Sequence, residues 1–140
     1  MITAVDTNVL LDLLMPNVLF VEASSTALES AARDGTLVIC DVVYAELSAH
    51  FTGQRQCDEF IDELGIRPEP LTRAASFLAS RIWRSYRLQG GTRQRILPDF
   101  LTGAHAQLQA SQLLTRDRGF YRGLFPSLTV LDPSAKPHRL

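Results

Sequence analysis

The chain has 140 residues, of which 46% are hydrophobic and 21% are charged. This length and composition predict one soluble globular domain with its own core, and they argue against a disordered or fibrous protein. The basic start and uncharged apolar run of a signal peptide are missing, and no apolar stretch is long enough to span a membrane, so we expect a cytoplasmic protein. Cys40 and Cys57 lack the spacing of a disulfide framework or zinc site and are expected to be free thiols.

The net charge of −1 conceals a division between two halves of the chain. Residues 1–69 carry twelve acids and three arginines, whereas residues 70–140 carry three acids and eleven bases. No acid lies between Glu69 and Asp99, although six arginines do. We interpret this interval as a candidate polyanion-binding surface, with ordinary solvated arginines as the alternative.

Four short apolar runs are predicted to be buried strands. They cover residues 2–5, 37–40, 113–115 and 128–131. Five longer stretches have helical spacing: 18–34, 42–52, 55–64, 72–88 and 98–111. Strands that alternate with helices are typical of parallel βαβ units, so the predicted fold class is α/β. Residues 1–132 are expected to form this domain, and the tail 133–140 is expected to fray.

Local signals place the ends of several helices. Asp34-Gly35 is predicted to end the first long helix, Asp41 to cap the next, and Pro98 to open the last, with Asp99 in its first turn. Residues 89–92, Gln-Gly-Gly-Thr, are predicted to form a loop between two helices.

Four acids are predicted to meet at one edge of the sheet. Asp6 directly follows the first strand, and Asp117 lies just beyond the strand at 113–115. Glu46 lies about one turn into the helix after the second strand, and Asp99 lies in the first turn of its helix. Ligands of open parallel sheets bind beyond the carboxyl ends of the strands, so these side chains are expected to converge. Taken singly, each could instead be a cap or a solvated residue.

Clustered carboxylates repel one another, and burial raises their pKa values unless a cation neutralises them. Oxygen ligands favour Mg²⁺ or Mn²⁺ over zinc. Such ions can activate a water, and a pair can stabilise both oxygens of an in-line phosphoryl displacement. The sequence therefore predicts metal-dependent cleavage of a phosphodiester bond.

Four segments together resemble those of the PIN-domain ribonucleases, and within that family the VapC-type toxins of toxin–antitoxin modules. They are Val5-Asp6-Thr7-Asn8-Val9-Leu10-Leu11, Val43-Tyr44-Ala45-Glu46-Leu47, Pro98-Asp99-Phe100-Leu101-Thr102-Gly103-Ala104-His105-Ala106 and Leu113-Leu114-Thr115-Arg116-Asp117-Arg118-Gly119-Phe120. The resemblance covers nearly the whole chain. It implies a three-layer α/β/α sandwich with a central parallel sheet, endoribonuclease activity with Mg²⁺ or Mn²⁺, homodimerisation and a VapB-type antitoxin.

The same resemblance implies roles for individual residues. By motif, the metal-binding acids are Asp6, Glu46, Asp99 and Asp117, and the supporting polar residues are Asn8 and Thr115. Some relatives carry a further acid where this chain has Arg118-Gly119, which leaves one or two metal ions as alternatives.

Arginines near the acids are candidates for binding RNA, because a guanidinium suits phosphate oxygens and stacks on bases. They are Arg93, Arg95, Arg116 and Arg118, and contact with the antitoxin is the alternative. The aromatic residues Trp83, Tyr86 and Tyr121 are expected in the core or a dimer interface rather than as stacking platforms. His105 is expected to pack in its helix rather than act as a base.

Three other functions were weighed. A haloacid-dehalogenase-type phosphatase needs a second aspartate two positions after the first, where this chain has Asn8. An RNase H-like fold opens with antiparallel strands, whereas here the first strand is expected to lead into a helix. A PIN-like module that binds RNA or protein without cutting would usually lack one of the four acids, and all four are present.

Overall fold

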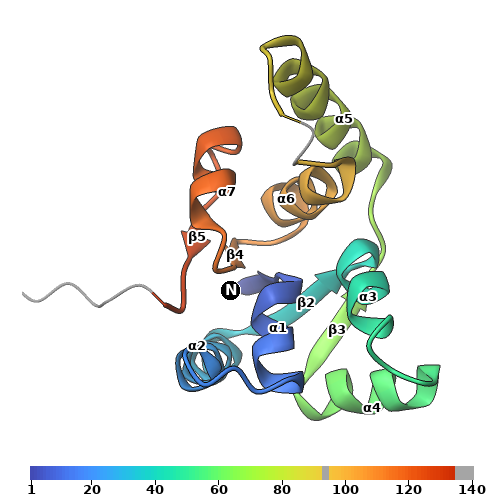
Figure 1. Ribbon diagram of the computed structural model, residues 1–140, viewed down its shortest axis with the longest axis vertical. Helices are drawn as coiled ribbons and strands as arrows, with labels where there is room; N and C mark the ends of the chain where they lie inside the picture. Colours follow the sequence, from blue (N-terminus) through green and yellow to red (C-terminus); the bar gives the residue numbers. More distant parts are fainter. Residues whose placement is uncertain (93–94, 135–140) are drawn as a thin grey trace, which may run out of the picture.

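A computed structural model describes residues 1–92 and 95–134 of the chain. Its centre is a five-stranded parallel sheet with the order β3-β2-β1-β4-β5 (Figure 1). The strands are β1 (Ile2–Val5), β2 (Thr36–Cys40), β3 (Ile66–Glu69), β4 (Gln112–Leu114) and β5 (Val130–Leu131). The helices are α1 (Thr7–Leu14), α2 (Val21–Asp34), α3 (Asp41–Ser48), α4 (Gln54–Glu63), α5 (Arg73–Leu88), α6 (Leu97–Gln109) and α7 (Arg118–Leu124).

Helices cover both faces of the sheet, and successive strand residues point to opposite faces. Val5 of β1 packs with α1, α2, α3 and α4 on one face, whereas its neighbour Ala4 packs with α5, α6 and α7 on the other. The same alternation separates Leu114 from Leu113 on β4. Figure 1 shows α5, α6 and α7 on one side of the sheet and α1 and α2 on the other. The predicted three-layer α/β/α architecture is therefore confirmed.

The register brings the ends of the central strands together. Val5, the last residue of β1, pairs with Leu114, the last residue of β4. Because all five strands are parallel, the residues that follow each strand lie at the same edge of the sheet. This edge is where the candidate site forms.

Most predicted elements are present, with boundary shifts of a few residues. The strand β3 and the bounds of α1 and α7 were not predicted. The prediction that Asp41 caps α3 is wrong, because Cys40 holds the cap position and Asp41 is the first helical residue. The Asp41 carboxylate instead accepts a hydrogen bond, at 3.1 Å, from the backbone N–H of Leu71 in the segment between β3 and α5. Both cysteines are buried free thiols, as expected.

No helix within the described ranges has both the length and the apolar character needed to cross a membrane.

Candidate active site

Asp6 is the central residue of the candidate site. It links β1 to α1 and caps that helix, because its Oδ1 accepts a hydrogen bond from the backbone N–H of Thr7 at 2.8 Å. Its Oδ2 accepts from the hydroxyls of Thr115 at 2.8 Å and Tyr121 at 3.2 Å. Asp6 is only 8% exposed, and this burial raises its pKa from 3.8 to about 6, against the opposing effect of these hydrogen bonds.

Asn8 and Thr115 join the two central strand ends. The Asn8 amide donates to the Thr115 hydroxyl at 3.2 Å and more distantly to Asp6 Oδ2 at 3.4 Å, while its Oδ1 accepts from the backbone N–H of Arg116 at 3.1 Å. The Thr115 hydroxyl also accepts from the backbone N–H of Asp117 at 3.0 Å. One short network therefore fixes Asp6 relative to the turn that carries Asp117.

Glu46 reaches the same region from α3. Its Oε1 accepts a hydrogen bond from the Thr7 hydroxyl at 2.9 Å, one residue after Asp6. Repulsion from Glu46 is one of the smaller effects that raise the pKa of Asp6. The predicted proximity of Asp6 and Glu46 is therefore found in the structure.

Asp99 and Asp117 belong to α6 and to the turn before α7, on the other face of the sheet. Asp99 is the third residue of α6, and its Oδ2 accepts from the backbone N–H of Ile96 at 3.3 Å. Burial, and more weakly the charge of Asp117, raise the pKa of Asp99. Asp117 precedes α7 and binds the guanidinium of Arg95 through both oxygens, at 2.5 and 3.2 Å.

Tyr121 connects these acids. It is buried on α7, and its pKa is raised well above 10, first by burial and then by the charges of Asp6, Asp99 and Asp117. The charges of these three acids therefore all act on one phenol, although Tyr121 is hydrogen-bonded to Asp6 alone among them. Its raised pKa also keeps the hydroxyl protonated, so it remains a donor to Asp6 at neutral pH.

The chemistry of these side chains suits a hard cation. Asp6 is a buried carboxylate whose hydrogen-bond donors within the described chain are all neutral, so a cation beside it would relieve the cost of its burial. As the side chains stand, however, no three Asp, Glu, His or Cys residues among positions 1–92 and 95–134 converge in a metal-binding arrangement. Glu46, Asp99 and Asp117 each accept hydrogen bonds from separate protein donors instead. The donor types fit Mg²⁺ or Mn²⁺, and binding would require some of these carboxylates to turn.

The arginines near the acids form ion pairs with the protein itself. Besides Arg95, the Arg116 guanidinium holds buried Asp12 of α1, with its Nε and Nη2 at 2.8 and 3.0 Å from the two carboxylate oxygens. The Arg118 Nε lies 3.5 Å from Asp132. Arg93, the fourth RNA-binding candidate, lies outside the described residues.

His105 and the aromatic residues occupy structural positions. His105 is buried, and its Nε2 lies 2.9 Å from Glu69 Oε1 at the end of β3. Burial lowers the pKa of His105, against the opposing effect of Glu69. The predicted packing role is confirmed. Tyr86 also packs as expected, with its ring 5.4 Å from that of Phe100.

Sequence reasoning missed two members of the site. Tyr121 lies one helical turn after Asp117, and its role follows only once α7 is known. Asp12 lies one turn after Asn8, on the face of α1 that meets Arg116. That i, i+4 spacing was the available signal, and using it would have required the bounds of the helix that follows the first strand.

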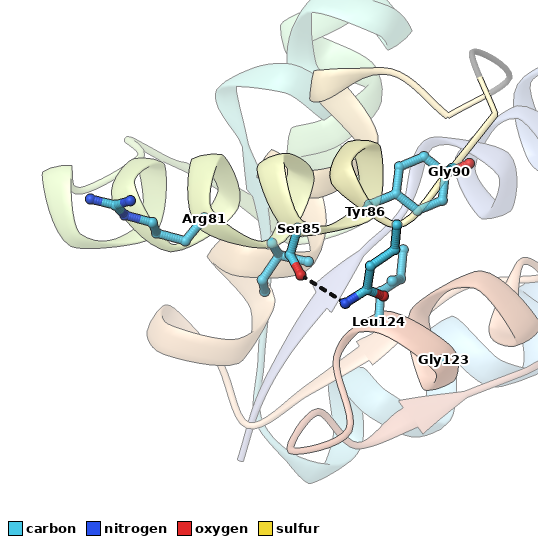
Figure 2. A pocket seen from close by; sticks show the side chains of 9 residues that line it. Arg81, Ser85, Tyr86, Gly90, Gly123 and Leu124 are labelled. Carbon is cyan, nitrogen blue, oxygen red and sulfur yellow. Dashed lines mark hydrogen bonds between the residues drawn. The ribbon is translucent and has the colours of Figure 1, made fainter.

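A separate hollow lies between α5 and α7, away from the acids. It measures about 450 Å³, and its lining includes Arg81, Ser85, Tyr86 and Gln89 of α5 and the turn after it, opposite Gly123 and Leu124 of α7. Figure 2 shows Arg81, Ser85 and Tyr86 along α5, with Gly123 and Leu124 of α7 facing them. The Gln89 side-chain amide donates a hydrogen bond to the Ser85 hydroxyl at 3.4 Å. None of the four predicted acids lines this hollow.

Comparison with known proteins identifies the family. The model of the PIN domain family matches residues 3–123. The chain therefore belongs to the PIN domain family, as its motifs predicted. No curated protein matches it at the level of sequence.

Solved structures of toxin–antitoxin complexes share the fold. VapBC2 from Rickettsia felis, bound to a DNA fragment from the promoter, is 19% identical with a TM-score of 0.72, over 94% of this chain and 98% of that one. A toxin–antitoxin complex from Klebsiella pneumoniae is 22% identical with a TM-score of 0.69, over 94% and 97%. VapBC-1 from nontypeable Haemophilus influenzae is 18% identical with a TM-score of 0.71, over 96% and 100%.

Proposed function

We propose that this protein is a metal-dependent endoribonuclease that acts in the cytoplasm as the toxin of a toxin–antitoxin pair. The observation that carries the proposal is the buried Asp6 carboxylate. Its pKa is raised to about 6 by burial and by nearby Glu46, and it accepts a hydrogen bond from Tyr121, on which the charges of Asp99 and Asp117 also act. A fold gains no stability from such a cluster, because burial and mutual repulsion both penalise the charged forms. Clusters of this kind are found where a protein has to bind a cation or a proton.

Asp6, Glu46, Asp99 and Asp117 would hold Mg²⁺ or Mn²⁺. The ion would supply an activated water and would stabilise negative charge on the phosphate oxygens. The chain itself orients the carboxylates, since Thr115 and Tyr121 fix Asp6 while Thr7 fixes Glu46. Rigid first-turn and strand-end positions suit this task because they limit the movement of the ligands.

The toxin assignment rests on the family and on its structural neighbours. The structures reported above are toxin–antitoxin complexes, and each covers nearly the whole of this chain. We propose a VapB-type antitoxin as the partner and a homodimer as the assembly. Exposed apolar side chains on α5 support such contacts, because Phe77 and Leu88 are 60% and 76% exposed.

The test is cleavage of a single-stranded or loop-containing RNA in Mg²⁺ or Mn²⁺. Asp6→Asn and Asp99→Asn should each lower the rate at least about a hundredfold, because each removes a proposed metal ligand. The matched control is Asp34→Asn. It removes an exposed acid at the end of α2, before β2 begins and thus at the opposite edge of the sheet.

Two outcomes would contradict the proposal. Equal cleavage in excess EDTA would exclude a metal mechanism. RNA that is bound equally by the protein and both variants, and cut by none, would favour the alternative of a binding module without catalysis. Brief expression in cells tests the toxin assignment, because growth should stop with the unaltered chain and continue with Asp6→Asn.

A further inference from the structure

Arg95 makes a contact that the proposed activity does not use. Its guanidinium binds both oxygens of Asp117, and the same group lies 4.4 Å from the centroid of the Phe120 ring. The pKa of Arg95 is raised, chiefly by this hydrogen bond to Asp117 and to a lesser degree by nearby Asp99. A fixed positive charge thus lies among the acids that would hold the metal ion.

We propose that Arg95 is an internal counter-ion that competes with the divalent metal for Asp117 and so weakens metal binding. The inference rests on the proposed function, because it concerns the metal site of that nuclease. It assigns a regulatory role to a residue of the chain itself.

The Arg95 contact opposes metal binding at Asp117 in two ways. A guanidinium that binds both oxygens of a carboxylate occupies one lone pair on each oxygen and leaves a cation only the remaining ones. A second positive charge placed beside the same carboxylate would also be repelled by the guanidinium. Metal binding at Asp117 is therefore favoured when Arg95 releases at least one oxygen.

Exposure indicates that this release is inexpensive. The side chains of Arg95 and Asp117 are 35% and 36% exposed, whereas those of Arg116 and Asp12 are 25% and 3% exposed. Water screens the first pair and can hydrate both groups when it opens. Opening of the second pair would leave the buried Asp12 carboxylate without a cation, with the neutral Ser24 hydroxyl as its remaining donor. Of these two pairs beside the site, the structure favours Arg95 as the exchangeable one and Arg116 as the permanent one.

The Phe120 ring can hold the Arg95 guanidinium after it has left Asp117. Phe120 lies three residues after Asp117, and its ring packs edge-on against Phe100 and Tyr121, at 5.3 and 4.9 Å between centroids. A cation over an aromatic face is stabilised without a carboxylate partner. Arg95 can therefore leave Asp117 and remain beside the site.

The test is direct binding of Mn²⁺, measured by titration calorimetry or by the electron paramagnetic resonance of free Mn²⁺. Arg95→Met should bind Mn²⁺ up to about fivefold more tightly than the unaltered chain, which corresponds to the strength of a partly exposed ion pair. Arg95→Lys should fall between them, because a point charge cannot engage both oxygens as the guanidinium fork does. Circular dichroism and thermal unfolding verify that each variant is folded.

Arg118→Met is the control for charge alone. It removes the same charge one residue from Asp117, but the Arg118 guanidinium contacts Asp132 rather than a proposed metal ligand. Its Mn²⁺ affinity should change less than that of Arg95→Met. An equal gain in Mn²⁺ affinity in both variants would show that the loss of a nearby positive charge, rather than the loss of the contact with Asp117, is responsible. That result would overturn the inference.

The remaining outcomes separate this inference from the proposed function. If the unaltered chain binds Mn²⁺ and Asp6→Asn does not, but Arg95→Met binds no more tightly than the unaltered chain, the metal site stands and the competition is refuted. If neither the unaltered chain nor Arg95→Met binds Mn²⁺, both proposals fail.

Discussion

Replacing Asp6 by asparagine should make the protein more stable at neutral pH, although it removes the central carboxylate of the proposed site. Asp6 is almost completely buried, and burial raises its pKa from 3.8 to about 6. The folded protein therefore binds this proton more tightly than the unfolded chain does. A group of this kind stabilises the fold when protonated and destabilises it when charged.

The size and pH range of the effect follow from that shift. A difference of about two pH units corresponds to about 3 kcal/mol of unfolding free energy. Because the folded pKa of Asp6 lies above the unfolded one, this stability is present below about pH 4 and is lost as the pH rises through about 6. Asparagine stays neutral and avoids the loss. We expect the unfolding free energy of Asp6→Asn to match that of the unaltered chain near pH 4 and to exceed it by about 1–3 kcal/mol at pH 7.5. The lower value allows for the lost hydrogen bond of a hydroxyl donor that must turn away from the new amide.

Urea unfolding at pH 4, 5, 6 and 7.5 in the presence of EDTA measures this difference without screening the charges. Excess Mg²⁺ or Mn²⁺ at pH 7.5 should then stabilise the unaltered chain and leave Asp6→Asn unchanged, because a ligand stabilises only the protein that binds it. Asp34→Asn is the matched control, and it should change stability by less than about 0.5 kcal/mol. A difference between Asp6→Asn and the unaltered chain that does not vary with pH, or an Asp6→Asn protein that is less stable at pH 7.5, would refute the reasoning.

Three further predictions concern packing and the limits of the site. Arg116→Met should lower the unfolding free energy by about 3 kcal/mol in urea titrations, because it leaves the buried carboxylate of Asp12 without its cation; a loss below about 1 kcal/mol would show that the pair is not structural. Gly103→Ala should cost about 1–3 kcal/mol in thermal unfolding, since an added Cβ would lie 2.6 Å from the ring of Phe125; unchanged stability would mean that the ring moves freely. His105→Gln should keep the RNA cleavage rate within about twofold, because the imidazole contacts Glu69 rather than one of the four proposed metal-binding acids. A loss of more than about tenfold would show that His105 takes part in catalysis.

Apolar composition determined which strands could be predicted. The central strands β1, β2 and β4 are covered on both faces and are largely apolar, and the edge strand β5 lies in the apolar run 128–131. The strand β3 lies at the edge of the sheet and reads Ile-Arg-Pro-Glu, with only Ile66 buried. Proline is tolerated there because an edge strand can leave one donor position unused. Such a segment carries neither apolar alternation nor β-branched enrichment.

The helix α1, which was predicted without bounds, and the helix α7, which was not predicted, both lack a readable period. The helix α1 reads Thr-Asn-Val-Leu-Leu-Asp-Leu-Leu, in which the buried, ion-paired Asp12 interrupts the apolar pattern. The helix α7 has only seven residues and contains Gly119 and Gly123. Pattern recognition needs more turns than this, and it cannot foresee that Asp12 is buried because an arginine about a hundred positions away neutralises it.

The strand-end placement of Asp6 and Asp117 could be predicted, but the hydrogen-bond partners of the four acids could not. The strand-end rule and the family motifs indicated which acids approach one another, since both depend on local sequence and sheet topology. The pairing of Arg95 with Asp117 and the contact of Tyr121 with Asp6 arise only when distant elements pack. The sequence placed several arginines beside the acids without showing which of them would neutralise an acid.

The network around Asp6 also sets the time at which the site can exist during synthesis. Asp6 is synthesised well before its hydroxyl donors, Thr115 and Tyr121, which follow it by 109 and 115 positions. The central strand β1 likewise has one unpaired edge until β4 has been synthesised. A nascent chain therefore carries an incomplete site until α7 has been translated, and a product truncated after β4 lacks both Asp117 and Tyr121. This order of assembly delays completion of the proposed site until most of the domain has been made.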